Sequence, residues 1–264
     1  MADSSETRKE RRVTARADRD RAAAASAQKR QRLWILGGAL ALAAAVVVVI
    51  ALASSGGSDK PKLKAGEQLP GQFEANARFA GIRQQGIELG NPKAPVTMVE
   101  FADLRCPYCR QYTEAVMPTL VANYVKTGKL RMIFRNVSIL GSDSISAAQM
   151  AGAAGLQNKL WPYIDIFYAN QGDERTAYVT EDFMRRIGRA VKGLNVDKAW
   201  NERGNAAVLR QITEAQTEFQ ANGFSGTPAF LVGPTGGKLE ALSVQAFTPD
   251  QFTPAIDRLL ASRS

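Results

Sequence analysis

The chain contains two cysteines in 264 residues, Cys106 and Cys109, and only two residues separate them. It contains no histidine. A structural zinc site takes about four Cys or His ligands, so one chain cannot build the usual kind, and Ser-His-Asp and Cys-His catalysis are excluded as well. We therefore expect no metal site and a chemistry based on the thiol pair itself.

The cysteine pair lies between a predicted strand and a predicted helix. Residues 96–101 (VTMVEF) form a short, largely apolar run with β-branched residues, which predicts a buried strand. Helical spacing follows from Pro107 to about Lys126, and Pro118 should kink this helix. Residues 130–137 predict a second strand. This order is a βαβ unit, which favours a parallel pair with a right-handed crossover.

The position of Cys106 at the start of the helix explains why a thiol there would be reactive. Unpaired N–H groups and the helix dipole favour an anion at this end, which lowers a thiol pKa from about 8.5 into a range of about 3.5–7.5. The thiolate is the attacking species in disulfide exchange. We expect Cys106 to be the nucleophile and Cys109 the more buried resolving thiol, with Pro107 in the first helical turn.

Two other uses of the cysteines remain open. A structural disulfide is one, although a bridge that closes so short a loop removes little entropy from the unfolded chain, and exported proteins that need such bridges usually have several. A zinc site shared by two chains is the other, and it requires a symmetric dimer. The redox interpretation is favoured because a Cys-x-x-Cys near a βαβ pattern is typical of thioredoxin-like proteins.

Residues 90–262 are predicted to form one domain that contains the cysteine pair. Residues 142–222 have helical patterns, and residues 228–232 predict a strand. Gly236 and Gly237 supply a hairpin turn after which residues 238–246 pair back, and a helix over 249–260 closes the domain. Residues 54–89 form a linker and extension. Four apolar residues of the extension are candidates to pack against the domain: Phe73, Phe79, Ile82 and Ile87.

An uncharged apolar segment, residues 33–53, predicts a single transmembrane helix, which needs about 20 such residues. Arg30 and Arg32 precede it, so the amino terminus is expected in the cytoplasm and residues 54–264 outside. A cleaved signal peptide is the alternative, because residues 51–53 (ALA) fit a cleavage site, but the apolar run exceeds the usual length of about 7–15 residues. Under either interpretation the domain lies outside the cytoplasmic membrane.

The basic tail, residues 1–32, carries ten Lys/Arg and five acidic residues in a chain of net charge +9. Basic tails can bind nucleic acid. Next to an apolar segment, however, this charge is explained as a topology signal, so we expect a disordered cytoplasmic tail and no nucleic-acid partner.

Two motifs resemble those of a known family. Residues 91–103 (NPKAPVTMVEFAD), which lead into Cys106-Pro107-Tyr108-Cys109, resemble the opening of DsbA-like thioredoxin-fold proteins, and residues 226–230 (GTPAF) resemble their cis-proline loop. The resemblance covers about residues 90–262. It implies an α/β thioredoxin-like fold, with a central mixed sheet and a helical insertion at about 142–222, here preceded by a transmembrane helix.

The resemblance also implies roles for individual residues. Cys106 would form the mixed disulfide with a client and Cys109 would resolve it, so the redox-active disulfide takes the place of a cofactor. Pro228 would follow a cis peptide bond and bring Thr227 beside the cysteines, where both, with Pro107 and Tyr108, would contact the client. From the residues alone, Pro228 is as well explained as a trans proline that opens a strand.

Glu100 lies six residues before Cys106, where similar proteins carry an acid beneath the active site. Burial there would raise its pKa and allow it to shuttle protons for Cys109; an exposed strand acid is the alternative.

The residue between the cysteines departs from enterobacterial DsbA, which has a histidine where this chain has the neutral Tyr108. We therefore expect the helix terminus, Arg105 and Arg110 to stabilise the thiolate, and a weaker oxidant than DsbA.

The function expected from these features is a membrane-anchored enzyme, a thiol–disulfide oxidoreductase. It would be a monomer that forms disulfides in exported proteins with free thiols and is recharged by a membrane quinone-linked partner. A reductase or an isomerase on the same fold is an alternative, although similar isomerases are dimers with a dimerisation domain for which residues 54–90 are too short. A tethered binding module with a structural disulfide is a further alternative.

Overall fold

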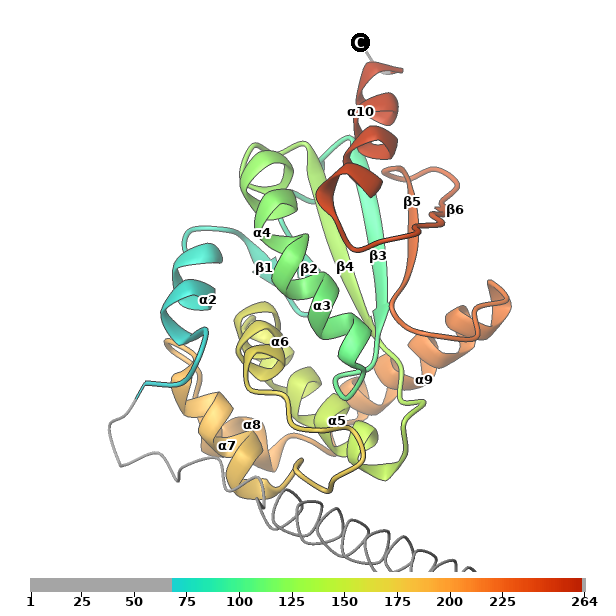
Figure 1. The fold of residues 1–264 in the computed structure, drawn as a ribbon. Coiled ribbons are helices and arrows are strands. Elements are labelled where there is room, and N and C mark those ends of the chain that lie inside the picture. Colours follow the sequence, from blue (N-terminus) through green and yellow to red (C-terminus); the bar gives the residue numbers. More distant parts are fainter. Residues whose placement is uncertain (1–67, 263–264) are drawn as a thin grey trace, which may run out of the picture. The chain divides into compact units, whose positions relative to one another are not determined.

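A six-stranded mixed sheet forms the centre of the protein in the computed structural model, which describes residues 68–262. Its strand order is β1-β2-β4-β3-β5-β6 (Figure 1). The pair β3 and β4 is parallel, as the βαβ pattern predicts, and every other neighbouring pair is antiparallel. The strands are β1 Gln84–Gln85, β2 Glu88–Leu89, β3 Val96–Ala102, β4 Leu130–Asn136, β5 Ala229–Pro234 and β6 Glu240–Ala241.

The helix after the cysteine pair is interrupted where the sequence predicts a kink. It consists of α3 (Pro107–Ala115), α4 (Met117–Leu120) and a π-helical turn (Val121–Val125). Pro118 is the second residue of α4. Because its ring clashes with the carbonyl group one turn earlier, α3 cannot run on through it.

The helical insertion lies between β4 and β5, as predicted. Backbone N–H groups at the start of its last three helices donate to the side chains of Thr180, Asn195 and Asn205, which cap these helices. The five helices are α5 Ser142–Leu156, α6 Leu160–Ala169, α7 Glu181–Ala190, α8 Val196–Asn201 and α9 Ala206–Ala221.

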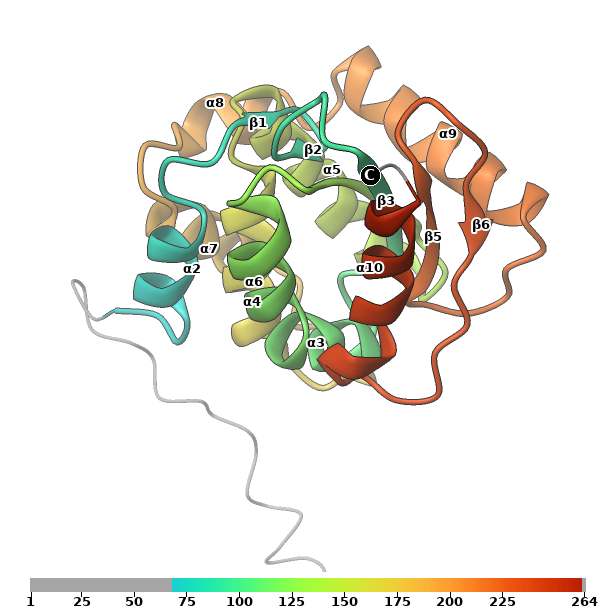
Figure 2. The same cartoon turned by 90° about the horizontal axis from the view of Figure 1, so that it is seen from above.

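The two faces of the central strands are covered by different helices. α3, α4 and α10 (Thr253–Ala261) lie on one side of β3 and β5, and α9 lies on the other (Figures 1 and 2). All seven residues of β3 are buried, in agreement with the predicted buried strand. Side chains of a strand alternate between its faces, so Val99 and Phe101 pack against Phe219 of α9, whereas Glu100 points to the opposite side.

The amino-terminal extension belongs partly to the sheet. It contains α2 (Gln72–Arg78) and the short strands β1 and β2, and β2 pairs with β4. The sheet thus starts at residue 84, ahead of residue 90, where the predicted domain begins. Phe79 is buried against Trp161, with ring centroids 6.4 Å apart. Phe73 is 73% exposed, so the prediction that it packs against the domain is wrong.

The hairpin after β5 is shorter than predicted. Gly236 has a φ of 78°, as a tight turn requires, but only Glu240 and Ala241 pair with β5, where residues 238–246 were expected. The chain then leaves the sheet, and the ring of Phe247 lies 6.4 Å from that of Tyr112 on α3. Residues 242–246 therefore connect β6 to a ring contact with α3 instead of extending the strand.

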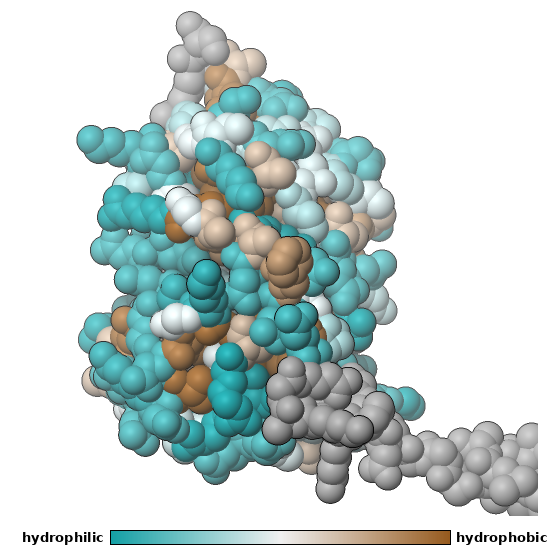
Figure 3. All heavy atoms as spheres, turned by 90° about the vertical axis from the view of Figure 1, so that its left-hand side faces the viewer, coloured by the Kyte–Doolittle hydropathy of each residue, from teal (hydrophilic) through white to brown (hydrophobic). Residues whose placement is uncertain are grey.

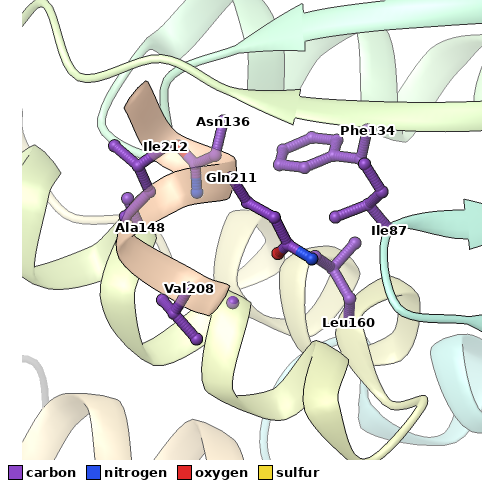
Figure 4. Close-up of a pocket in the computed structure, with 9 residues that line it drawn as sticks. Ile87, Phe134, Asn136, Ala148, Leu160, Val208, Gln211 and Ile212 are labelled. Atoms are coloured by element: carbon purple, nitrogen blue, oxygen red, sulfur yellow. The ribbon is translucent and has the colours of Figure 1, made fainter. Parts of the chain in front are cut away.

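The described part of the chain has surface hollows of about 440 and 550 Å³ beside residues 80–82, which follow α2, and a much smaller interior cavity. The face that carries α2 and α4 is mostly hydrophilic, with apolar side chains in small separate groups (Figure 3). A cavity of about 10 Å³ lies between β4, α5 and α9, and Gln211 extends across it (Figure 4). This volume holds about one water molecule. Across residues 68–262, no helix has the length and apolar content to span a bilayer; the candidate segment 33–53 and the basic tail lie outside these residues.

Candidate active site

The cysteine pair lies at the junction of β3 and α3, as the sequence predicts. Cys106 is the N-cap residue of α3, with φ −73° and ψ 122°, and Pro107 is the first helical residue. Both thiols are reduced. Cys106 is 5% exposed and Cys109 is completely buried, whereas the side chain of Tyr108 between them is largely exposed. The sulfur nearer the surface is therefore the one at the helix start.

The two thiols have opposite pKa shifts. The pKa of Cys106 falls from 9.0 to about 6, chiefly because of a hydrogen bond with the Cys109 thiol, with help from the backbone N–H groups of Tyr108 and Cys109 and against the effect of burial. The Thr227 side chain also lowers it, although its hydroxyl lies outside hydrogen-bonding geometry. Burial raises the pKa of Cys109 well above its usual value, and the hydrogen bond with Cys106 adds to this. At neutral pH, Cys106 is a thiolate and Cys109 a thiol.

The two arginines beside the cysteines are directed elsewhere. The guanidinium of Arg105 donates to the carbonyl oxygens of Leu140 (2.6 Å), Thr176 (3.2 Å) and Glu174. Arg110 forms an ion pair of 2.7 Å with Glu114, one turn along α3. Hydrogen bonds within the active-site turn are the main source of thiolate stabilisation. The expected share of these two cations is therefore wrong, because Arg105 donates to carbonyl groups of two loops and Arg110 pairs with Glu114.

The loop before β5 meets the cysteine pair through its backbone. The Thr227–Pro228 peptide bond is cis, as the family resemblance implies, which excludes the trans alternative. When Cys106 is protonated, its thiol donates to the carbonyl oxygen of Thr227 at 3.2 Å, although 121 positions separate the two residues. The structure thus brings together the two motifs that carry the resemblance.

Asp103 organises the turn that leads into Cys106. One carboxylate oxygen accepts a hydrogen bond from the N–H of Arg105 at 2.8 Å, and the other accepts from the N–H groups of Ile139 (2.9 Å) and Leu140 (3.0 Å). It therefore joins the active-site turn to the loop between β4 and α5. This role is not among those predicted from the sequence, although Asp after a strand is a known signal for a side-chain-stabilised turn.

Gln171 holds the same turn from the helical insertion. Its side-chain N–H group donates to the carbonyl oxygens of Leu104 (2.9 Å) and Cys106 (3.1 Å), and it is 5% exposed. Tyr168, one turn earlier, donates to the carbonyl oxygen of Asp103 at 3.2 Å. No pattern in the sequence points to these contacts, because they join segments about 65 residues apart.

Glu100 is buried beneath the active site and is not an exposed strand acid. Its exposed fraction is 1%, and both carboxyl oxygens lack a hydrogen-bond partner among residues 68–262. Burial, and then the charge of Asp165, raise its pKa from 4.5 to about 8. At neutral pH it is therefore mostly protonated, so it has a proton to give.

A family model described as "Thioredoxin" matches residues 83–258, about two thirds of the chain. The chain belongs to this thioredoxin family. The "Probable disulfide bond formation protein D" of Bacillus cereus is 32% identical over 162 residues, which are 60% of this chain and 74% of the relative. The protein of the same name from Bacillus anthracis is 30% identical over an equal length, with the same coverage of both chains.

Solved structures agree on the fold. Oxidised BdbD from Bacillus subtilis has a TM-score of 0.58 and 20% identity and covers 68% of this chain and 97% of its own. A thioredoxin-like oxidoreductase from Silicibacter pomeroyi has a TM-score of 0.54 and 28% identity over 72% of this chain and 98% of its own. The thioredoxin-like, DsbA-like fold predicted from sequence is thus confirmed, and the chain is a thiol–disulfide oxidoreductase.

Proposed function

We propose that this oxidoreductase forms disulfide bonds in exported proteins through Cys106 and Cys109. The observation that carries the proposal is the lowered pKa of Cys106 at the start of α3, next to a Cys109 whose pKa is raised. A dithiol whose reduced form is stabilised gives a more oxidising disulfide, and this is how DsbA becomes a strong oxidant. A stable thiolate at Cys106 therefore favours transfer of the disulfide to a client.

The reaction passes through one mixed disulfide. A client thiolate attacks Cys106 Sγ, which breaks the Cys106–Cys109 bond, and Cys109 leaves as a thiolate that takes up a proton. A second client thiol gives its proton to solvent and attacks the client sulfur of the mixed disulfide, so that Cys106 leaves as a thiolate. Two electrons pass from client to enzyme, the client gains a disulfide and the enzyme becomes a dithiol.

Client binding involves the residues that surround Cys106. The backbone of Thr227 already contacts its sulfur, and Pro228 opens onto β5, so an extended client segment would lie along this loop. Tyr108 presents an exposed ring, and Pro107 adjoins it in the first turn of α3. These residues offer backbone hydrogen bonds and apolar contact without selecting a particular client side chain, as an enzyme with many clients needs.

Glu100 is the proposed proton donor to Cys109. A thiolate with a strongly raised pKa needs a proton as it leaves, and Glu100 is a buried acid with a pKa of about 8. A general acid works best when its pKa lies near the working pH.

The proposed location is the outer face of the cytoplasmic membrane, with residues 33–53 as the anchor. Exported proteins with free thiols would be the substrates, and a quinone-linked membrane protein would reoxidise the cysteine pair. The names of the Bacillus relatives, which describe disulfide bond formation, support this direction. A reductase is the second candidate, because Tyr108 is neutral and the two neighbouring arginines, Arg105 and Arg110, are directed away from the thiolate.

Measurement of the redox potential against glutathione separates these functions. An oxidase is expected between thioredoxin, at about −270 mV, and DsbA, at about −120 mV. A value below about −300 mV with an inert disulfide would indicate a structural bridge instead. In parallel, Cys109→Ala should trap exported proteins as mixed disulfides through Cys106, and a Cys106→Ala control should trap none. Oxidised wild type that fails to oxidise any reduced client would contradict the oxidase.

A further inference from the structure

The carboxyl group of Glu100 points between α3 and α6. Its neighbours in the sheet register are Phe134 on β4 and Phe230 on β5, and directly opposite residues on neighbouring strands point to the same face. The ring of Phe230 lies 4.7 Å from that of Tyr112 on α3. The ring of Phe134 lies 6.0 Å from that of Trp161 on α6. On one side of Glu100 an aromatic contact therefore reaches α3, and on the other side an aromatic contact reaches α6.

Asp165 lies on the same side of α6, one turn after Trp161, since residues four apart share a helix face. Its side chain is 10% exposed, and an oxygen lies 2.5 Å from the guanidinium of Arg78. The negative charge of Asp165 acts on Glu100. Two acidic side chains therefore share this region beneath the cysteines, and one of them is paired with a cation.

The cation comes from the amino-terminal extension. Arg78 ends α2, which lies beside α6 (Figures 1 and 2) and precedes the segment that the thioredoxin family model matches, residues 83–258. Its own side chain is 19% exposed. The ion pair therefore joins a residue ahead of the family-matched segment to a helix within that segment.

The other charged groups around Asp165 oppose its ionisation. Burial raises its pKa to about 6, Glu114 on α3 and Glu74 on α2 add to the rise, and Arg78 is the group that lowers it. The hydroxyl groups near Glu100, those of Tyr112 and Tyr168, have raised pKa values and are neutral at physiological pH. Ionised Asp165 is thus the charge that Glu100 faces, and Arg78 is its counter-ion.

We propose that Arg78 is a positioning residue for the cysteine pair: it holds Asp165 as a carboxylate beside Glu100, and this carboxylate keeps the proton on Glu100. The inference rests on the proposed role of Glu100 in thiol–disulfide exchange. When Cys109 leaves as a thiolate, Glu100 gives it a proton and becomes a carboxylate. Repulsion from Asp165 keeps Glu100 protonated at neutral pH, so that the proton is present when Cys109 leaves, and it favours the return of a proton from solvent to Glu100 before the next cycle.

The test measures the reduction of the oxidised protein by dithiothreitol as a function of pH. In the oxidised protein the two cysteines are joined and do not titrate. The rate, divided by the concentration of dithiothreitol thiolate, then reports the proton donor. For the wild type this normalised rate should be constant at low pH and fall above about pH 8, because Glu100 has lost its proton. Glu100→Gln should remove the fall.

The variants Arg78→Met and Asp165→Asn should each move the fall to lower pH, by about one unit, which is a typical effect of one nearby charge. Asp165→Asn removes the charge directly, and Arg78→Met lets Asp165 become neutral. Arg78→Lys should restore the wild-type profile. The matched control is Arg83→Met, which removes another arginine of the extension, one that donates to the exposed Gln85.

If the pH dependence of the normalised rate is unchanged in both Arg78→Met and Asp165→Asn, the proposal is overturned. If it shifts in Asp165→Asn alone, the proposed role of Arg78 is wrong. If Arg78→Met does not fold, Asp165→Asn and Arg78→Lys still decide whether the charge matters. The measurement uses a small dithiol, so it does not depend on the direction of electron flow in the cell. A protein that exchanges with dithiothreitol but oxidises no client would contradict the proposed oxidase and leave this inference standing.

Discussion

The two faces of β3 differ in what they pack against. On one face Val99 and Phe101 join Phe219 of α9 in an apolar cluster, with the rings of Phe101 and Phe219 6.0 Å apart. On the other face, between the apolar Met98 and Ala102, lies the carboxyl group of Glu100, which has no hydrogen-bond partner among the described residues. A single strand therefore contributes to stability on one side and to chemistry on the other.

The comparison teaches that burial has opposite consequences for apolar and for ionisable side chains. Burial of Phe101 removes apolar surface from water and stabilises the fold. Burial of Glu100 and Cys109 disfavours their charged forms and raises both pKa values. Changes on the α9 face should therefore affect the free energy of unfolding, and changes on the α3 face should affect proton and disulfide exchange.

The strongest contrast is expected from Cys106→Ala. This change removes the attacking sulfur and should abolish disulfide exchange with any thiol, while the melting temperature stays close to that of the reduced wild type because the replaced group is small. Exchange assays with a reduced client and a thermal melt measure the two effects. Residual exchange in this variant would show that Cys109 can act as nucleophile, against its burial.

Phe101→Ala on the opposite face should do the reverse. A Phe-to-Ala change in a core costs about 3–5 kcal/mol, so the urea midpoint should fall strongly. The pKa of Cys106, measured by alkylation with iodoacetamide as a function of pH, should stay at about 6. Phe101→Leu is the milder control. A shifted Cys106 pKa in a folded Phe101 variant would break the separation between the two faces.

Glu100→Gln should alter the pH dependence of stability. The folded pKa of Glu100 is about 8, against an ordinary value of 4.5, so the folded protein binds more protons than the unfolded chain between these values. Its contribution makes the wild type less stable as the pH rises from about 4.5 to about 8. The variant lacks this loss and should be more stable than the wild type at pH 8, by about 1–3 kcal/mol once the buried amide is allowed for.

Urea unfolding at pH 5 and at pH 8 tests this prediction. The difference in unfolding free energy between variant and wild type should grow with pH. A difference that does not change between these two values would mean that Glu100 titrates near its ordinary pKa.

The smallest effect is expected from Tyr108→His, which should change the Cys106 pKa and the redox potential but hardly change stability. The side chain at this position is 62% exposed, so stability should change by less than about 0.5 kcal/mol. A protonated imidazole beside Cys106 favours the thiolate, so the Cys106 pKa should fall below about 6. Each pKa unit corresponds to about 1.4 kcal/mol, or about 30 mV in a two-electron couple. The potential against glutathione should rise accordingly, and Tyr108→Phe should leave it unchanged.

Much of the fold was predictable because it depends on spacing along the chain. The run at 96–101, the helix after Pro107 and its interruption at Pro118 follow from periodicity and from the proline ring. The extent of β6 was not predictable: only Glu240 and Ala241 pair with β5, and the later ring of Phe247 lies near Tyr112 of α3. Phe73 was expected to be buried and is exposed. A single apolar residue in a short helix does not indicate which face of that helix packs against the domain.

The candidate site divides in the same way. The residue pattern by itself determined that the two cysteines lie at a helix start. The family resemblance supplied the cis-proline loop and the buried acid at position 100. Only the tertiary structure decided that Arg105 binds loop carbonyls, that Gln171 holds the active-site turn and that Arg78 pairs with Asp165. The physical reason is distance along the chain. A helix start or a strand is set by neighbouring residues, whereas a charge finds its partner only when the packing of whole helices brings distant segments together.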